Sequence, residues 1–298
     1  MTYLADKTYW KIGGNCDFYY EVESIDELIA TLELIKKLGK SYVVIGNGTN
    51  ILFDTSGFEN AVIKLGRSFD YLNISGREVE VGASVWVPGL VRKLSKVGMG
   101  GLEHCIGIPA TLGGLVSMNG GSQRQSISER LVSVKYINGD GKIINWKADP
   151  TEFSYRTSPF KNNSRVIISC TIRVDEISPN QNRKKLLEIL RERRLKFPRK
   201  LPNCGSVFMS SPEIYKKKGP PGYIIESLGL KGTKIGNAQI SELHANFIVN
   251  LGGATSEDVI QLVKLINYRC YKEYGFIMHA EAIFYSKTGD SFSLSDIK

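Results

Sequence analysis

Residues 107–121 read GIPATLGGLVSMNGG, with five glycines and no charged side chain. A solvated linker of this length would be rich in polar and charged residues. Glycine lets a second molecule come close to the main chain, because no Cβ stands in the way. This composition therefore predicts a backbone segment that lies against a large uncharged partner.

The chain of 298 residues is long for one domain and has room for two or three packed subdomains. Its apolar content of 42% and charged content of 23% are ordinary for a soluble globular protein. No apolar run approaches the length of roughly 18–20 residues that a membrane span needs. The N-terminus lacks the pattern of a secretory signal. We expect a cytoplasmic protein that does not insert into membranes.

The cysteines are scattered singly and form no CxxC pair, which argues against a disulfide framework and against a zinc site. We therefore expect reduced, packed thiols and no bound metal. The formal charge is +9, and the basic residues concentrate in residues 183–200 and 215–219. Aromatic residues are not interleaved there as in a single-strand binder, so we expect no nucleic-acid partner. A solvated helix face and a site for a phosphorylated small molecule both stay open. The cysteines are Cys16, Cys105, Cys170, Cys204 and Cys270.

Hydrophobic periodicity predicts an α+β protein, in which helices with capping signals alternate with strands of period two. Glycine and proline breaks near Gly66 and Ser178 divide the chain into three predicted subdomains, 1–66, 67–178 and 179–298. The predicted helices follow Ser24, occupy 87–97, follow Ser178 and follow Thr255, and the predicted strands lie within 41–53, 78–85, 131–147 and 165–174.

A second glycine-rich turn, VIGNGTN, lies at residues 44–50. It lacks the third glycine of a G-x-G-x-x-G fingerprint and no helix pattern follows, so a Rossmann nucleotide site is disfavoured. Taken alone, it is either a plain tight turn or a turn whose N–H groups face an anion. Together with residues 107–121, it fits a large cofactor that has both a diphosphate and a flat ring.

Three further residues are candidates for chemistry, and each has a structural reading as well. Ser206 follows a glycine, and by pattern alone it is a turn residue. Arg156 follows Tyr155 in an irregular segment, where it is either a surface residue or a ligand of carboxylate or phosphate. Glu281 lies in the apolar stretch FIMHAEAIFYS, as a paired, protonated or site-edge carboxylate, or as an exposed strand residue.

The ordered set of these segments resembles the MurB family, the UDP-N-acetylenolpyruvoylglucosamine reductases of bacterial peptidoglycan synthesis. The resemblance implies an FAD-binding fold of the vanillyl-alcohol oxidase type in three subdomains, with the substrate held mainly by a MurB-like C-terminal domain. The segments that carry it are TYWKIGG, VIGNGTNILF, GLEHCIGIPATLGGLVSMNGG, FSYRTSPF, LPNCGSVF, IIESLGLKGTKIGNAQISELHANFIVN and the closing Glu281.

The resemblance also implies a reaction in which NADPH reduces FAD and reduced FAD reduces an enolpyruvyl ether. Ser206 would donate the final proton, and Arg156 and Glu281 would stabilise an enediolate. The substrate, a UDP-sugar enolpyruvate, would be bound by Tyr155, Arg193 and Lys196. We expect a monomer. FAD would be bound by Gly46, Asn47, Gly48, Thr49, Asn50, Ile108, Pro109, Thr111, Gly113, Gly114, Asn119 and Gly120.

Some positions depart from the family pattern. Ala110 replaces a usual glycine, and His279-Ala280 replaces the usual Glu-Pro. Met209-Ser210 replaces a common Lys-Asn at a position that contacts the uridine nucleotide, and an insertion follows it. These changes leave open a second reading, a paralogous flavoprotein oxidoreductase that acts on a related small molecule.

Overall fold

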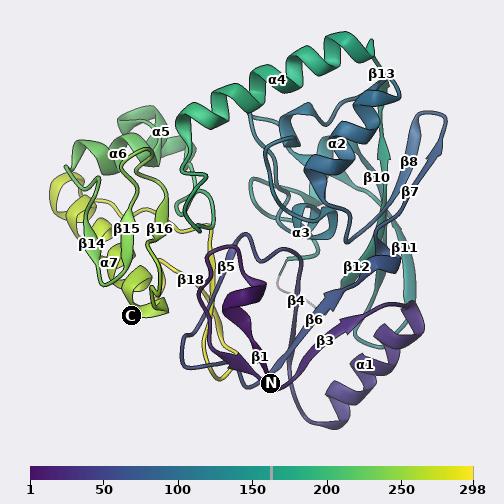
Figure 1. The fold of residues 1–298 in the computed structure, drawn as a ribbon, viewed down its shortest axis with the longest axis horizontal. Coiled ribbons are helices and arrows are strands. Elements are labelled where there is room, and N and C mark those ends of the chain that lie inside the picture. The colour runs from purple at the N-terminus through teal and green to yellow at the C-terminus, as the bar shows by residue number, and fades with distance from the viewer. Residues whose placement is uncertain (162–163, 298) are drawn as a thin grey trace. The chain divides into compact units, whose positions relative to one another are not determined.

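The computed structural model describes residues 1–161 and 164–297, which form two compact units (Figure 1). Unit 1 comprises Met1–Tyr19, Gly48–Ala61 and Arg194–Lys298, and unit 2 comprises Tyr20–Asn47 and Val62–Arg193. Each unit is therefore built from segments that are distant in the sequence.

Unit 2 contains a five-stranded antiparallel sheet in the order β11-β10-β12-β8-β7. The inner strand β12 is almost wholly buried, as its apolar sequence VIISCTIR requires. Helix α3 packs on β12 and β8 of this sheet, and helix α2 packs on residues 99–105. The strands are β7 (Leu72–Ser75), β8 (Glu78–Gly82), β10 (Leu131–Ile137), β11 (Ile143–Lys147) and β12 (Val166–Arg173), and the helices are α2 (Val87–Lys96) and α3 (Leu112–Ser117).

A second sheet, in the order β3-β6-β4, has most of its residues in unit 2. Its strands are β3 (Tyr19–Val22), β4 (Tyr42–Ile45) and β6 (Ala61–Leu65). Helix α1 (Ile25–Lys37) begins where the sequence predicts, because the Ser24 hydroxyl accepts a hydrogen bond from the Glu27 N–H at 3.0 Å. It ends before Gly39, whose φ of +63° suits a residue that follows a helix.

Unit 1 contains a sheet in the order β14-β15-β16 with α7 packed on it, and a sheet in the order β18-β17-β5. Strand β17 runs parallel to β5, with Ile283 opposite Ile51. Trp10 lies in the core and donates a hydrogen bond to the Ile248 carbonyl at 2.9 Å. The strands are β5 (Ile51–Phe53), β14 (Lys234–Ile235), β15 (Ala238–Ile240), β16 (Ile248–Asn250), β17 (Ile283–Tyr285) and β18 (Ser291–Ser293).

The C-terminal helix α7 (Ser256–Tyr274) confirms a predicted capping box, in which Thr255 and Asp258 bond reciprocally to each other's backbone N–H. The insertion that follows Met209 forms two short helices, α5 (Pro212–Lys218) and α6 (Pro221–Ser227). Helix α4 (Pro179–Lys196) starts at the predicted proline. The remaining elements are β1 (Thr2–Tyr3), β2 (Asn15–Cys16), β9 (Met99–Gly100), β13 (Asp175–Glu176), η1 (Leu4–Lys7), η2 (Arg67–Phe69), η3 (Glu103–Cys105), η4 (Ile127–Arg130) and η5 (Pro150–Glu152).

Two local expectations from the sequence are wrong in detail. Residues 107–121 do not form a continuous glycine loop, because Leu112–Ser117 fold into α3 behind a cap at Thr111. Glu281 does not lie inside a strand, since β17 begins only at Ile283. The glycines of residues 107–121 hid the helix α3, and the apolar neighbours of Glu281 hid the start of β17.

Within the described residues, no helix is long and apolar enough to cross a membrane. The same part of the chain holds no cluster of three or more His, Cys, Asp or Glu side chains that could bind a metal ion. None of the five cysteines forms a disulfide bond, and all five are buried.

Candidate functional site

The first glycine-rich segment, as far as Asn47, contacts the second segment inside unit 2. The Asn47 side-chain amide donates a hydrogen bond to the Pro109 carbonyl at 2.8 Å. At Gly46, a Cβ would collide with the Thr111 hydroxyl, so only glycine allows this approach. Gly46, Asn47, Pro109 and Thr111 were all predicted to bind the cofactor, and the structure brings these four residues together.

Thr111 also organises the start of α3, where its hydroxyl accepts the Gly114 N–H at 3.4 Å. The next N–H groups are already bonded, Leu112 to the Val85 carbonyl and Gly113 to the Ala83 carbonyl, each at 2.9 Å. A Cβ at Gly114 would meet only the Thr111 hydroxyl, at 3.3 Å. The first turn of α3 therefore presents a small, half-buried, uncharged surface rather than free N–H donors.

Free donors occur in the first glycine turn instead. In the described chain, the backbone N–H groups of Asn47, Gly48 and Thr49 donate no hydrogen bond. Gly48 has a φ of +61°, and a Cβ there would lie 2.7 Å from the Thr8 Cα in unit 1. Consecutive N–H groups around a left-handed residue suit an anion such as a phosphate.

Arg156, one of the three predicted catalytic residues, lies in unit 2 with a strained backbone. Its φ is +57°, in the left-handed region that non-glycine residues rarely occupy. Its Nη2 donates a hydrogen bond to the Gly121 carbonyl at 3.1 Å. Its guanidinium lies over the ring of Tyr155, 5.0 Å from the centroid, while Tyr155 itself is exposed. The strain and these contacts together fix the direction of the guanidinium.

Asn119 supports the loop that carries Arg156 through hydrogen bonds. Its Nδ2 donates to the Ser154 carbonyl at 2.9 Å, and its Oδ1 accepts the Ser128 N–H at 3.3 Å. Its own φ is +43°. Both polar atoms of the Asn119 side chain, which was predicted to bind the cofactor, thus form hydrogen bonds to the backbone of unit 2. Next to it, Gly120 is packed against Leu115, where a Cβ would lie 3.4 Å from the Leu115 Cγ.

A second arginine, Arg193, lies against the backbone of the same region of unit 2. Its side chain covers Gly107, where a Cβ would lie 2.9 Å from the guanidinium carbon. Burial lowers the pKa of Arg193, and the nearby Cys105 thiol raises it slightly. Burial raises the pKa of Cys105 to about 12, although Arg156 and Arg193 both pull it down. The thiol is therefore uncharged near neutral pH, so it does not cancel the positive charge of the two arginines.

Ser206 and Glu281 come together in unit 1 through their backbones. The Glu281 N–H donates to the carbonyl of Val207, the residue after Ser206, at 2.7 Å. The Asn50 side chain donates to the Glu281 carbonyl at 3.1 Å. Burial raises the pKa of the Cys204 thiol, and the Glu281 carboxylate raises it further, so this carboxylate lies near Cys204. In the described residues, the Ser206 hydroxyl makes no hydrogen bond.

Asn246 is a supporting residue that sequence reasoning missed. Its Oδ1 accepts the Phe208 N–H and its Nδ2 donates to the Phe208 carbonyl, both at 2.9 Å. Its own carbonyl accepts the Val207 N–H at 2.9 Å. The available signal was an asparagine among the apolar residues of 245–249, because an amide that becomes buried there needs hydrogen-bond partners.

Lys196, the remaining predicted substrate ligand, lies exposed at the end of α4 in unit 1. Burial lowers the pKa of His244, and Lys196 is among the cations that lower it further. Ile108 is half-buried in unit 2, and its N–H bonds to the Cys105 carbonyl at 3.0 Å. In unit 1 the structure thus brings Asn50, Ser206 and Glu281 together, and it places Lys196 near His244.

These surfaces fit FAD, the cofactor that the resemblance implies. The N–H groups of Asn47, Gly48 and Thr49 are suitable donors for a phosphate. The small uncharged surface around Gly113 and Gly114 is suitable for a flat ring. The nearby arginines supply positive charge for a negatively charged ligand.

Two known families match separate parts of this chain. Residues 16–147 match the family described as FAD binding domain, and residues 197–285 match the family described as UDP-N-acetylenolpyruvoylglucosamine reductase, C-terminal domain. These matches confirm the predicted fold class of an FAD-binding part followed by a MurB-type C-terminal domain.

Individual relatives cover nearly the whole chain. The chain is 40% identical over 287 residues to UDP-N-acetylenolpyruvoylglucosamine reductase 1 of Corynebacterium glutamicum, covering 96% of this chain and 86% of the relative. It is 35% identical to the corresponding reductase of Bacillus subtilis, covering 93% and 90%. The crystal structure of UDP-N-acetylenolpyruvylglucosamine reductase from Thermus caldophilus matches with a TM-score of 0.80 at 30% identity, covering 95% of this chain and 97% of that one.

Proposed function

Because this chain belongs to the UDP-N-acetylenolpyruvoylglucosamine reductase family, we propose that it is an FAD-dependent oxidoreductase of peptidoglycan synthesis. Its substrate is the enolpyruvyl ether of UDP-N-acetylglucosamine, and its product is UDP-N-acetylmuramate. NADPH is the proposed electron donor. The single observation that carries this proposal is the backbone hydrogen bond from the Glu281 N–H to the carbonyl of Val207, the residue that follows Ser206.

FAD would be held by the two glycine segments. The N–H groups of Asn47, Gly48 and Thr49 would bind its diphosphate, and the surface around Gly113 and Gly114 would lie against its ring. The other predicted contacts in the two segments complete the binding surface. They are Gly46, Asn50, Ile108, Pro109, Thr111, Asn119 and Gly120.

When bound, FAD would carry a hydride from NADPH to the terminal carbon of the enolpyruvyl group. The adjacent carbon then bears negative charge next to the substrate carboxylate, and this enediolate needs one proton. Ser206 would donate that proton, since its hydroxyl is not used elsewhere in the described chain. Arg156 and Glu281 would stabilise the negative charge, and one well-placed donor contributes about 3–4 kcal/mol in such a role.

The substrate would be bound by Tyr155, Arg193 and Lys196. The two cations would contact the diphosphate, since charge-assisted bonds to phosphate are strong and directional. Met209-Ser210 and the helices α5 and α6 after it are the proposed cause of any altered substrate preference. A paralogous flavoprotein with a related substrate is the second candidate function, and these departures favour it.

We further propose that the chain acts as a monomer in the cytoplasm, where both UDP-sugars and NADPH are available. The division at residues 66 and 178 is the proposed functional division, with the first two parts binding FAD and the third binding substrate. The family matches at 16–147 and 197–285 support the separation of a cofactor part from a substrate part.

The test separates the two half-reactions. The FAD-loaded protein is reduced by NADPH without oxygen, excess NADPH is removed, and UDP-N-acetylglucosamine enolpyruvate is added while flavin absorbance is recorded. We expect rapid reoxidation of the flavin and formation of UDP-N-acetylmuramate. Reduced protein that stays reduced would contradict the proposed substrate and favour the paralogue.

Ser206→Ala tests the proton donor. We expect flavin reduction by NADPH at the wild-type rate, but reoxidation by the substrate slower by roughly 100-fold or more, because general-acid catalysis is lost. Stopped-flow absorbance measures both steps. Equal loss of both half-reactions would assign Ser206 a structural role instead.

A further inference from the structure

Helix α4 is held by few apolar contacts. Its 18 residues are strongly polar, and its buried side chains are Asn182, Leu186 and Ile189. These three follow the i, i+4, i+7 spacing of a single helix face. Two buried aliphatic side chains are a small hydrophobic contribution for a helix of this length. The placement of α4 on unit 2 therefore depends on its polar contacts.

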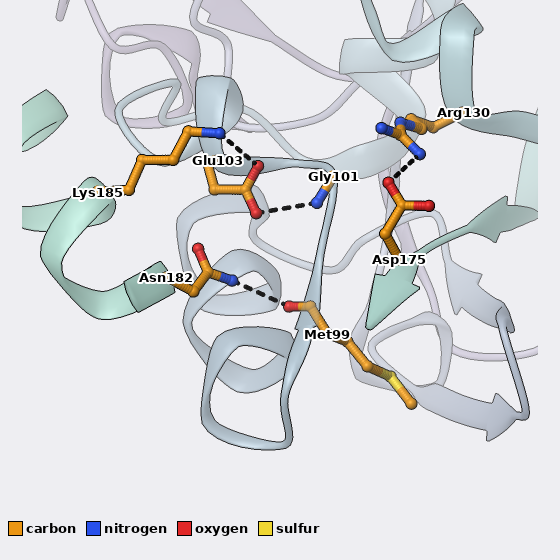
Figure 2. Close-up of polar contacts among 7 residues, drawn as sticks. All are labelled: Met99, Gly101, Glu103, Arg130, Asp175, Asn182 and Lys185. Carbon is orange, nitrogen blue, oxygen red and sulfur yellow. Dashed lines mark hydrogen bonds and ion pairs between the residues drawn. The ribbon is translucent and has the colours of Figure 1, made fainter. Parts of the chain in front are cut away.

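The polar contacts near the start of α4 converge on residues 99–103 (Figure 2). Asn182 Nδ2 donates to the Met99 carbonyl at 3.1 Å, and Lys185 Nζ lies 3.4 Å from Glu103 Oε2. Glu103 also accepts the Gly101 N–H at 2.9 Å. The Glu103 side chain is only 7% exposed, so this ion pair is poorly screened by solvent on the carboxylate side.

The electrostatics agree with a fixed carboxylate at this position. Burial alone would raise the pKa of Glu103, but the hydrogen bond from the Gly101 N–H and the Lys185 ammonium outweigh burial, so the pKa of Glu103 lies below its ordinary value. Arg130 adds a second brace, since it pairs with Asp175 at 2.6 Å (Figure 2). A Cβ at Gly101 would lie 3.1 Å from the Arg130 guanidinium carbon. The turn that receives α4 is thus itself fixed.

The other end of the same helix face carries Arg193. It lies 11 positions after Asn182, which continues the i, i+4, i+7 stripe. Its side chain covers Gly107, only four positions after Glu103. Residues 99–107 therefore contact α4 twice, once through Asn182 and Lys185 and once through Arg193.

Stability alone does not explain the buried amide. Asn182 is 1% exposed, and within the described residues its Oδ1 has no hydrogen-bond partner. An unsatisfied buried acceptor is unfavourable, and a leucine in the same place would avoid it. A polar group kept in such a place can instead fix one relative position of two elements, as a buried asparagine does in coiled coils.

We propose that Glu103 and Asn182 are positioning residues that hold Arg193 in place to bind the diphosphate of the substrate. They act by fixing α4 on residues 99–107 and do not themselves contact the ligand. This inference rests on the proposed function, because it takes the nucleotide diphosphate as the ligand of Arg193.

The experiment measures the dissociation constant of uridine diphosphate for the FAD-loaded enzyme by calorimetry. We expect Glu103→Gln and Asn182→Leu each to weaken binding by on the order of tenfold, since a small displacement of a positioned group has effects of this size or larger. The rate of flavin reduction by NADPH should not change. Glu176→Gln, which breaks the exposed Arg77–Glu176 pair of the same unit, is the matched control and should bind normally.

A double variant distinguishes positioning from a general loss of structure. If Glu103 acts through Arg193, then Glu103→Gln adds no further loss of affinity to that of Arg193→Ala. Additive losses, or wild-type affinity in both single positioning variants, would overturn the inference. If Glu103→Gln does not fold, Lys185→Met removes the same ion pair from a side chain that is 55% exposed.

The outcomes also separate this inference from the proposed function. A wild-type enzyme that is not reoxidised by the enolpyruvyl substrate and does not bind uridine diphosphate would remove both. A wild-type enzyme that is reoxidised by the substrate, with an Arg193→Ala variant that binds uridine diphosphate normally, would overturn only the positioning role. Thermal midpoints are recorded in parallel to show that each variant is folded at the temperature of the binding measurement.

Discussion

Ser206 and Glu281 are held by backbone of ordinary geometry, whereas Arg156 is held by strained backbone. In unit 1, hydrogen bonds from Glu281 to Val207 and from Asn50 to Glu281 fix the segment. In unit 2, the residue itself has a φ of +57°, and Asn119 beside it has +43°. The difference suggests two ways of orienting a side chain, by satisfied amides or by a constrained loop.

Strain in this protein is concentrated around Arg156. Apart from Lys11, the described non-glycine residues with positive φ are Asn119, Gln123, Arg124 and Arg156, all in unit 2. Such conformations persist only where the surroundings enforce them, and they cluster at functional sites. We therefore expect that removing a contact of the Arg156 loop in unit 2 changes its conformation more than removing a contact of the Ser206–Glu281 segment in unit 1.

The largest expected effect follows from Gly121→Ala. A Cβ there would lie 2.7 Å from the Ser126 Cα and would collide with the Gln125 carbonyl. The Gly121 carbonyl, which accepts from Arg156, would move, and we expect kcat to fall by about 100-fold. Steady-state kinetics measures this. Gly89→Ala is the control, because its Cβ would meet only the exposed Trp86 ring at 3.2 Å. Normal kcat in Gly121→Ala would show that the loop tolerates displacement.

The corresponding change in unit 1 is Asn246→Ala. It leaves the Phe208 N–H and carbonyl without their partners, and we expect the free energy of unfolding to fall by about 2–3 kcal/mol. Urea denaturation followed by fluorescence checks this value. Asn73→Ala, on the exposed strand β7, should leave stability unchanged. A strong loss of kcat with unaltered stability would contradict the view that Asn246 acts through the backbone.

The smallest effect is expected for Arg124→Gly, which addresses strain directly. Arg124 is exposed and has a φ of +63°, a conformation that glycine adopts more easily. We expect a gain of about 0.5–1 kcal/mol in the free energy of unfolding, with unchanged kcat. Arg124→Gln removes the charge but keeps the strain, so it should not stabilise. A loss of stability in Arg124→Gly would mean that its side chain contributes more than the strain costs.

Local signals predicted much of the fold. The caps at Ser24 and Thr255, the proline at 179 and the alternation in 78–82 all mark elements that the structure contains. Helix α3 was missed, because six residues with two glycines give no helical period. Short helices of this kind form through tertiary contacts, which no local pattern reveals.

The site was less accessible to sequence reasoning than the fold. Residue types alone left Ser206 and Arg156 as ordinary turn and surface residues, and their proposed roles rest on the resemblance of whole segments. The bond between Asn50 and Glu281 joins residues 231 positions apart, so no spacing rule predicts it. The positive φ of Arg156 was equally hidden, because arginine has no preference for that conformation.

Helix α4 is a rigid element, so a tilt at its start displaces the residues near its end. From Asn182 to Arg193 it rises about 16 Å, so a tilt of about 5° at one end moves the other by about 1.4 Å. A shift of that size exceeds the range over which a hydrogen bond to a phosphate oxygen keeps its strength. Few apolar contacts hold α4, so its bonds to Met99 and Glu103 determine how precisely the Arg193 guanidinium is positioned.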